Sequence, residues 1–131
     1  MRYPRLCCPP FDNKFNVKVL VIVNFGPWSG SLGVTALRLV RGVSGTGASV
    51  AAVYFREDGI YQALPSRAHD AGTPDLREGW LELAERDGFP LLLCSSASQR
   101  RLECCPKGGF REAGRAEVLA LMGECDRVVS L

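Results

Sequence analysis

Residues 17–24, VKVLVIVN, restrict the fold most strongly, because they form a nearly continuous run of β-branched and apolar side chains. A run of this kind is typical of a strand that is buried on both faces, as in a parallel sheet covered by helices. Residues 48–55 and 89–94 are two further apolar segments with the length of strands. The sequence therefore predicts a parallel sheet inside an α/β domain.

Segments with helical periodicity alternate with these strands. Residues 31–43 place apolar side chains at intervals of three and four residues. A second helix is expected over residues 74–86, capped by Thr73 and ended by Gly88. The other expected elements are a turn at 56–59, helices at 60–64, 95–102 and 113–125, and strands at 109–112 and 126–131. This alternation predicts a three-layer, flavodoxin-like α/β domain with a parallel five-stranded sheet.

The bulk composition describes one globular domain. The chain has 131 residues, of which 47% are hydrophobic, and its net charge of +2 is too small to indicate nucleic acid or an anionic membrane as a partner. No apolar run approaches the roughly 18 residues of a transmembrane helix. Residues 1–16 contain three prolines and no apolar signal-peptide core. We expect an irregular leader over 1–16, an α/β domain over 17–131, and a cytoplasmic location.

Cysteine is the residue type with the clearest chemical potential. The six cysteines lie at positions 7, 8, 94, 104, 105 and 125. Without a secretory signal, reduced thiols are expected rather than a disulfide framework. Cys94 is the strongest candidate, since it ends a strand and precedes a helix, where parallel sheets bind ligands and helix N–H groups favour a thiolate. Arg100 and Arg101 would add positive potential; the alternative is a buried structural cysteine.

Residues 26–31, GPWSGS, are a second candidate site, because they follow the first strand and precede a helix. A loop in this position can bind an anion with backbone N–H groups. The segment has neither the Gly-Lys-Ser/Thr of a Walker loop nor a GxGxxG pattern. A tight turn between strand and helix is the alternative.

The remaining reactive side chains carry less signal. The adjacent pairs Cys7-Cys8 and Cys104-Cys105 lack the spacing of zinc ligands, so no metal site is expected. Cys104 or Cys105 could instead serve as a resolving thiol. His69, the one histidine, lies in an expected loop without a nucleophile beside it in the sequence, which argues against a hydrolase.

Four short segments give the chain a resemblance to the DsrE/TusD family of sulfur-relay subunits, over residues 17–131. They are Gly26-Pro27, residues 53–61 (VYFREDGIY), residues 93–101 (LCSSASQRR) and residues 125–129 (CDRVV). Each is short and weak alone, but their order and spacing together make the resemblance specific. Residues 102–107 are shorter than the corresponding family segment, and residues 1–16 have no counterpart in it.

The resemblance implies a flavodoxin-like fold and a sulfurtransferase that needs no cofactor. The cysteine matching Cys94 would take a persulfide sulfur from a TusA-like carrier protein, or give one to it, in tRNA 2-thiouridine synthesis or dissimilatory sulfur oxidation. The partners would be DsrE/F/H-type or TusB/C/D-type subunits in a heterohexamer, with no direct contact to nucleic acid or membrane. The residues expected in the pocket or near the thiolate are Gly26, Pro27, Trp28, Asp58, Gly59, Arg100 and Arg101.

Two alternatives remain open from the sequence. The protein could be a non-catalytic subunit in which Cys94 is structural, or a thiol-disulfide redox protein that pairs Cys94 with Cys104 or Cys105. In each case an oligomer is expected, homomeric if the protein is alone. Trp28, Tyr61 and Trp80 are more large aromatic side chains than a small core encloses, and exposed aromatics mark interfaces.

Overall fold

The computed structural model describes residues 17–28, 31–64, 75–102 and 108–131. Within these ranges no helix is long and apolar enough to cross a membrane. The elements, in chain order, are β1 (Lys18–Val23), α1 (Leu32–Gly45), β2 (Ser49–Phe55), the 3-10 helix η2 (Glu57–Ala63), α2 (Leu76–Asp87), β3 (Leu91–Cys94), α3 (Ser95–Arg101), β4 (Phe110–Ala113), α4 (Arg115–Glu124) and β5 (Arg127–Ser130).

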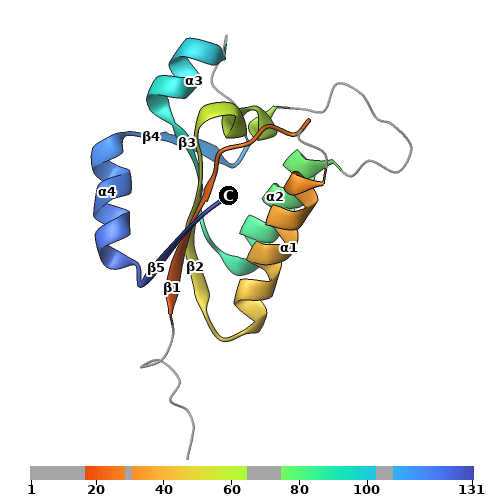
Figure 1. The fold of residues 1–131 in the computed structure, drawn as a ribbon, viewed down its shortest axis with the longest axis vertical. Helices are drawn as coiled ribbons and strands as arrows, with labels where there is room; N and C mark the ends of the chain where they lie inside the picture. Colours follow the sequence, from red (N-terminus) through yellow and green to blue (C-terminus); the bar gives the residue numbers. More distant parts are fainter. Residues whose placement is uncertain (1–16, 29–30, 65–74, 103–107) are drawn as a thin grey trace, which may run out of the picture.

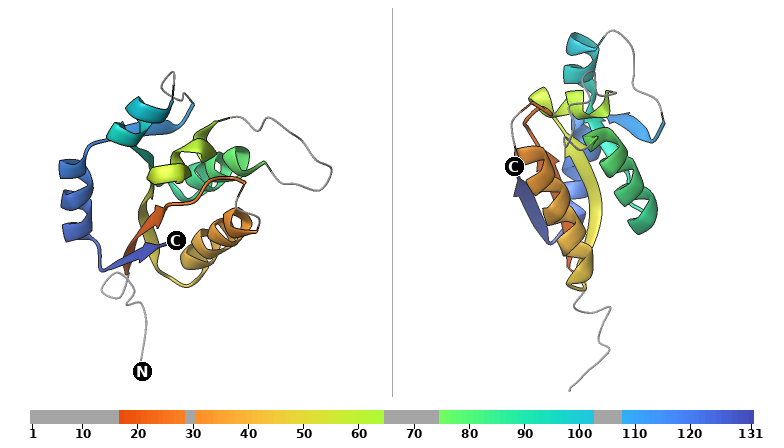
Figure 2. Two further views of the ribbon diagram at one scale, coloured as in Figure 1. Left: turned by 45° about the horizontal axis from the view of Figure 1, so that its top comes forward. Right: turned by 90° about the vertical axis from the view of Figure 1, so that its right-hand side faces the viewer.

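The five strands form one parallel sheet in the order β4-β3-β2-β1-β5. Helices α1 and α2 cover one face and α4 covers the other, while α3 stands at the carboxyl end of β3 (Figures 1 and 2). The chain runs along the sheet from β1 to β4 and then returns to β5 beyond β1. Because such crossovers are right-handed, this reversal puts α4 on the opposite face from α1 and α2. The expected three-layer α/β fold with a parallel five-stranded sheet is confirmed.

Strand β1 lies inside the sheet, between β2 and β5, and all of its residues except the first are buried. Successive side chains point to opposite faces. Val19, Val21 and Val23 therefore join the core under α1 and α2. Leu20 and Ile22 join a smaller core under α4. The apolar run of β1 is thus explained by two covered faces.

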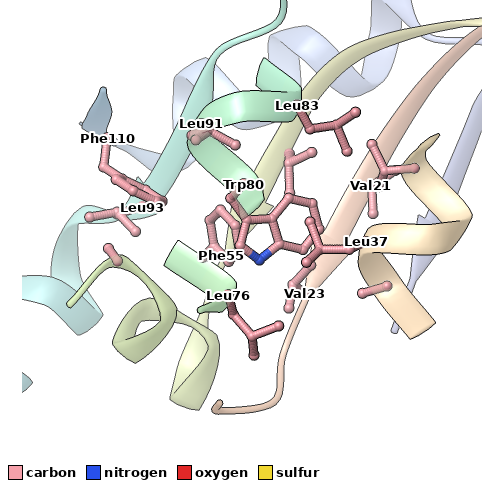
Figure 3. Close-up of a cluster of buried hydrophobic side chains, with 14 of the residues drawn as sticks. Val21, Val23, Leu37, Phe55, Leu76, Trp80, Leu83, Leu91, Leu93 and Phe110 are labelled. Atoms are coloured by element: carbon pink, nitrogen blue, oxygen red, sulfur yellow. The ribbon is translucent and has the colours of Figure 1, made fainter. Parts of the chain in front are cut away.

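Trp80 of α2 occupies the centre of the larger core (Figure 3). Its indole is fully buried and meets Phe55 edge-on, with ring centroids 5.3 Å apart. The indole Nε1 donates to Gln62 Oε1 over 2.6 Å, and Gln62 Nε2 donates to the backbone oxygen of Phe25 over 2.9 Å. These bonds connect α2, η2 and the segment after β1 while satisfying two buried polar side chains.

Two local expectations differ from the structure. Helix α2 is capped by Asp75, whose carboxylate accepts a hydrogen bond from the Glu78 N–H over 3.3 Å, and not by Thr73, which lies outside the described residues. Residues 56–59 were expected to form a separate turn, but η2 includes three of them, because it packs onto the end of β1. A side chain at Gly59 would collide with the carbonyl oxygen of Val23, so glycine permits this close approach.

Candidate functional site

Cys94 is the last residue of β3 and the N-cap of α3. Leu92, two residues earlier, pairs in register with Tyr54 of β2. Since alternate residues of neighbouring parallel strands share a face, Cys94 and Tyr54 both point to the α4 side of the sheet. The thiol therefore lies at the carboxyl end of the sheet, where parallel α/β proteins bind ligands.

The sulfur of Cys94 is half-buried and surrounded by hydrogen-bond donors. Ser96 Oγ lies 3.5 Å from Cys94 Sγ. Burial acts to raise the pKa of Cys94, but the hydroxyl groups of Ser96 and Tyr54 and the backbone N–H groups of Ala97 and Ser96 outweigh it. The pKa of Cys94 is consequently below that of an ordinary thiol, which favours the reactive thiolate.

Tyr54 serves as a donor to this thiolate and not as a base. Its side chain is only 6% exposed. Burial, followed by the hydrogen bond to Cys94, raises the pKa of Tyr54 far above its usual value. The phenol therefore keeps its proton across the physiological pH range and can hold the sulfur anion in place.

A pocket of about 300 Å³ opens beside Cys94, between α4 and the carboxyl ends of β2 and β3. Three arginines and one glutamate are the ionisable residues around it, together with Cys94 and Tyr54. Its lining consists of Ile22, Tyr54, Arg56, Glu57, Cys94, Ser96, Ala97, Arg100, Arg115, Val118, Leu119 and Met122. The pocket thus combines a thiol, an excess of positive charge and an apolar wall.

The two arginines singled out in the sequence have different surroundings. Arg100 lines the pocket and donates from Nε to the backbone oxygen of Ser96 over 3.2 Å. Arg101 turns to η2, where it pairs with Asp58 over 2.6 Å and with Glu57 over 3.3 Å. Arg101 and Asp58 therefore connect α3 to η2 rather than surrounding the sulfur.

The expected loop residues Gly26, Pro27 and Trp28 do not line the pocket. Trp28 is 63% exposed, and its ring lies against Tyr61 with centroids 5.2 Å apart. Gly26 lies beneath that indole, where a side chain would collide with the ring. Gly59 does not line the pocket either, and its role is to allow close packing against the end of β1.

Several residues singled out in the sequence fall outside the described residues. They are Cys7, Cys8, Ser29, Gly30, His69, Cys104 and Cys105. Among the residues that are described, no group of three or more His, Cys, Asp or Glu side chains could hold a metal ion. A resolving thiol at Cys104 or Cys105 stays a prediction.

Five polar pocket residues were not identified as site residues from the sequence: Tyr54, Arg56, Glu57, Ser96 and Arg115. Tyr54 and Arg56 lie in a segment that carries the family resemblance. Whether they share a face of the sheet with Cys94 depends on the register between β2 and β3. Arg115 comes from the helix that crosses the opposite face. Only Ser96, two residues after the cysteine on a helix N-terminus, had a usable local signal.

Cys125 provides an internal comparison for Cys94, because it is the other free cysteine in the described part of the chain. It follows α4 and precedes β5, at the amino end of the sheet, opposite Cys94. Burial, followed by the charge of Glu124, raises the pKa of Cys125. The two half-buried thiols thus have pKa values displaced in opposite directions.

The comparisons with known proteins agree with this architecture. The model of the DsrE/DsrF-like family matches residues 17–131. The chain belongs to the DsrE/DsrF-like family. Sulfurtransferase TusD of Sodalis glossinidius (strain morsitans) is 30% identical to this DsrE/DsrF-like chain over 90 residues, which are 69% of the chain and 64% of that relative. The chain therefore spans less than two thirds of the length of this relative.

A solved structure supports the fold of this DsrE/DsrF-like protein. The crystal structure of the ychN protein from E. coli superposes with a TM-score of 0.73 and covers 88% of this chain and 99% of its own. The two sequences are 16% identical, so the likeness establishes the fold alone.

Alkylation of Cys94 is expected to reach its half-maximal rate at a lower pH than alkylation of Cys125. The pKa of Cys94 is lowered and that of Cys125 is raised, and only the thiolate reacts. Iodoacetamide labelling across a pH series, resolved by peptide mass spectrometry, measures both midpoints in one sample. An Arg100→Ala/Arg101→Ala variant should change the Cys94 midpoint little, since Arg101 is engaged by η2. Coincident midpoints for the two cysteines would contradict the expectation.

A Tyr54→Phe variant is expected to slow Cys94 alkylation at neutral pH roughly tenfold. A hydrogen bond to an ionised group is worth about 1.5–3 kcal/mol when buried, and the partial exposure of the sulfur reduces this value. Phenylalanine keeps the ring between the sheet and α4, so packing is preserved. Tyr61→Phe is the matched control, because Tyr61 lies on η2 against Trp28. An unchanged Cys94 rate in the Tyr54 variant would show that the phenol does not hold the thiolate.

Proposed function

We propose that this protein is a sulfurtransferase that receives a sulfane sulfur on Cys94 as a persulfide and passes it to the next protein of a sulfur relay. The observation that carries the proposal is the Cys94 thiol, with its lowered pKa, at the end of β3 in an open pocket. A thiolate that is partly exposed and held by donors suits nucleophilic attack on sulfur. Family membership and the similarity to a protein named sulfurtransferase TusD support the same activity.

The chemistry proposed for Cys94 needs no metal or organic cofactor. Its thiolate attacks the outer sulfur of a persulfide on a TusA-like carrier, and the carrier cysteine leaves as a thiolate. Tyr54 and Ser96 orient the attacking sulfur through their hydroxyl groups. Transfer onward is the same exchange, with the outer sulfur of the Cys94 persulfide as the atom attacked. The destinations implied by the family resemblance are tRNA 2-thiouridine synthesis and sulfur oxidation.

Assembly with related DsrE/F/H-type or TusB/C/D-type subunits, or with copies of itself, is part of this proposal. Large apolar side chains on two separate surfaces support it. Leu119 of α4, which lines the pocket beside Cys94, is 64% exposed, and Trp28 before α1 is 63% exposed. Side chains of this kind are typical of the centre of protein interfaces.

The experiment that tests the proposal is sulfur loading from a persulfidated carrier. The purified protein is incubated with the carrier in its persulfide form or its reduced form, and its intact mass is then measured. We expect one added sulfur atom only with the persulfide form, located on the peptide that contains Cys94. An unmodified protein would favour the structural role for Cys94. A disulfide between Cys94 and Cys104 or Cys105 would favour thiol-disulfide redox activity.

A further inference from the structure

The pocket beside Cys94 contains positive charge that is not needed to lower the pKa of the thiol. Guanidinium groups of Arg56, Arg100 and Arg115 line it, against one carboxylate, that of Glu57. The leading influences on the pKa of Cys94 are burial and hydrogen bonds, not these charges. Like charges gathered around one cavity repel one another, so an anion that enters it would be stabilised.

These arginines come from three different parts of the fold and line the same pocket. Arg56 follows β2, Arg100 lies in α3, and Arg115 is the first residue of α4. Burial raises the pKa of Tyr54, while the charges of Arg56 and Arg115 act in the opposite direction. Both guanidinium groups therefore lie close enough to influence the pKa of the Tyr54 hydroxyl. This hydroxyl is hydrogen-bonded to Cys94.

The charge is only partly neutralised by the protein. Glu57 is shared between Arg56, at 3.4 Å, and Arg101, at 3.3 Å. Arg100 donates from Nε to a backbone oxygen of its own helix. The side chain of Arg115 makes no hydrogen bond or ion pair with any residue that the structure describes. Guanidinium donors therefore remain available to a carboxylate that enters the pocket.

The size and the walls of the pocket restrict the ligand further. A volume of about 300 Å³ lies at the small end of ligand pockets, which suits a small peptide or metabolite. Ile22, Val118, Leu119 and Met122 form an apolar wall of the pocket. Such a wall accommodates the carbon skeleton of a ligand whose carboxylates bind the guanidinium groups.

We propose that this pocket binds low-molecular-weight thiol persulfides that bear carboxylates, so that Cys94 takes sulfur directly from a small donor as well as from a carrier protein. The inference rests on the proposed function, because it names a second class of donor for the same cysteine. The observations that carry it are the three arginines that line the pocket, the apolar wall and the small volume beside the thiol.

The transfer step is balanced without another reactant. The Cys94 thiolate attacks the outer sulfur of the donor RS–SH, and a new S–S bond forms as the S–S bond of the donor breaks. The donor leaves as the thiolate RS⁻, and its proton stays on the transferred sulfur. The sulfur of Cys94 is oxidised to the persulfide level while the inner sulfur of the donor is reduced to the thiol level.

Saturation kinetics with two matched donors test this inference. The donors are glutathione persulfide and the persulfide of glutathione dimethyl ester, which lacks both carboxylates. Initial rates of Cys94 loading are measured by quenching and mass spectrometry, at a pH where Cys94 is ionised in every variant. We expect loading to saturate with glutathione persulfide and to be slower with the ester.

Charge-neutralising variants identify the binding groups. An Arg56→Gln/Arg115→Gln variant should raise the half-saturating concentration of glutathione persulfide about tenfold without slowing loading from the ester. The matched control is Arg38→Gln/Arg41→Gln, which removes the same charge from exposed positions on α1, on the other face of the sheet. Loading that rises linearly with both donors overturns the inference. An equal loss of rate with both donors also overturns it, since the arginines would then act on the thiol.

A parallel reaction with the persulfidated carrier separates this inference from the proposed function. If the carrier loads Cys94 but the small donor shows no saturable, carboxylate-dependent loading, only the inference about the pocket fails. If neither donor loads Cys94, both the inference about the pocket and the proposed function fail.

Discussion

A Cys94→Ser variant is expected to gain no sulfur from a persulfidated carrier, whereas the wild-type protein gains one atom. Serine preserves the size of the side chain and its position between β3 and α3. Its hydroxyl stays protonated at neutral pH and cannot attack the outer sulfur of a persulfide, so transfer should fall by several orders of magnitude. Intact-mass measurement over a time course gives both rates.

Cys125→Ser is the control for this experiment. It also removes a half-buried thiol, but one at the amino end of the sheet whose pKa is raised. Wild-type loading in this variant, with none in Cys94→Ser, would assign the sulfur to Cys94. Continued loading of the Cys94→Ser protein would refute the assignment, and Cys104 and Cys105 would then be the candidates for the sulfur-carrying residue.

A Trp80→Ala variant is expected to lower the free energy of unfolding by about 3–5 kcal/mol, the usual cost of truncating a buried aromatic side chain. The indole is fully buried against Phe55, and its loss would also leave Gln62 Oε1 without its donor. Urea denaturation followed by far-UV circular dichroism measures the change without depending on tryptophan fluorescence.

Trp28→Ala is the matched control for the stability measurement. Trp28 is 63% exposed, and its main described contacts are Tyr61 and Gly26. Its removal should cost no more than about 1.5 kcal/mol, the range of one aromatic pair. Equal losses of stability in the two variants would contradict the assignment of Trp80 to the centre of the core.

The strands of the sheet could be predicted from the sequence because they coincide with short segments of recognisable pattern. The apolar run of β1 requires two covered faces, and the structure has helices on both sides of it. Gly88 ends α2 with a left-handed φ of 75°, a conformation that glycine adopts without strain. The N-terminal cap of α2 was predicted incorrectly because threonine and aspartate are both good N-caps, and Asp75 is the one that caps the helix.

The surroundings of Cys94 could be predicted only in part, because they depend on contacts between distant segments. The position of Cys94 between a strand and a helix was visible in the sequence. The phenol of Tyr54 reaches the sulfur through the pairing of β2 with β3. Arg115 reaches the pocket because the chain reverses after β4 and α4 crosses the other face. Neither fact follows from spacing along the chain.

The position of β5 has a consequence for how the chain folds. This strand pairs with β1, and the hydrogen bond from the Lys18 N–H to Asp126 closes a sequence separation of 108 residues. Parallel pairing across so long a loop is a slow step, since the entropy of loop closure is lost before the contact is gained. Until β5 docks, one edge of the apolar strand β1 has unpaired backbone groups. A newly synthesised chain is therefore most prone to aggregate in the interval before β5 pairs with β1.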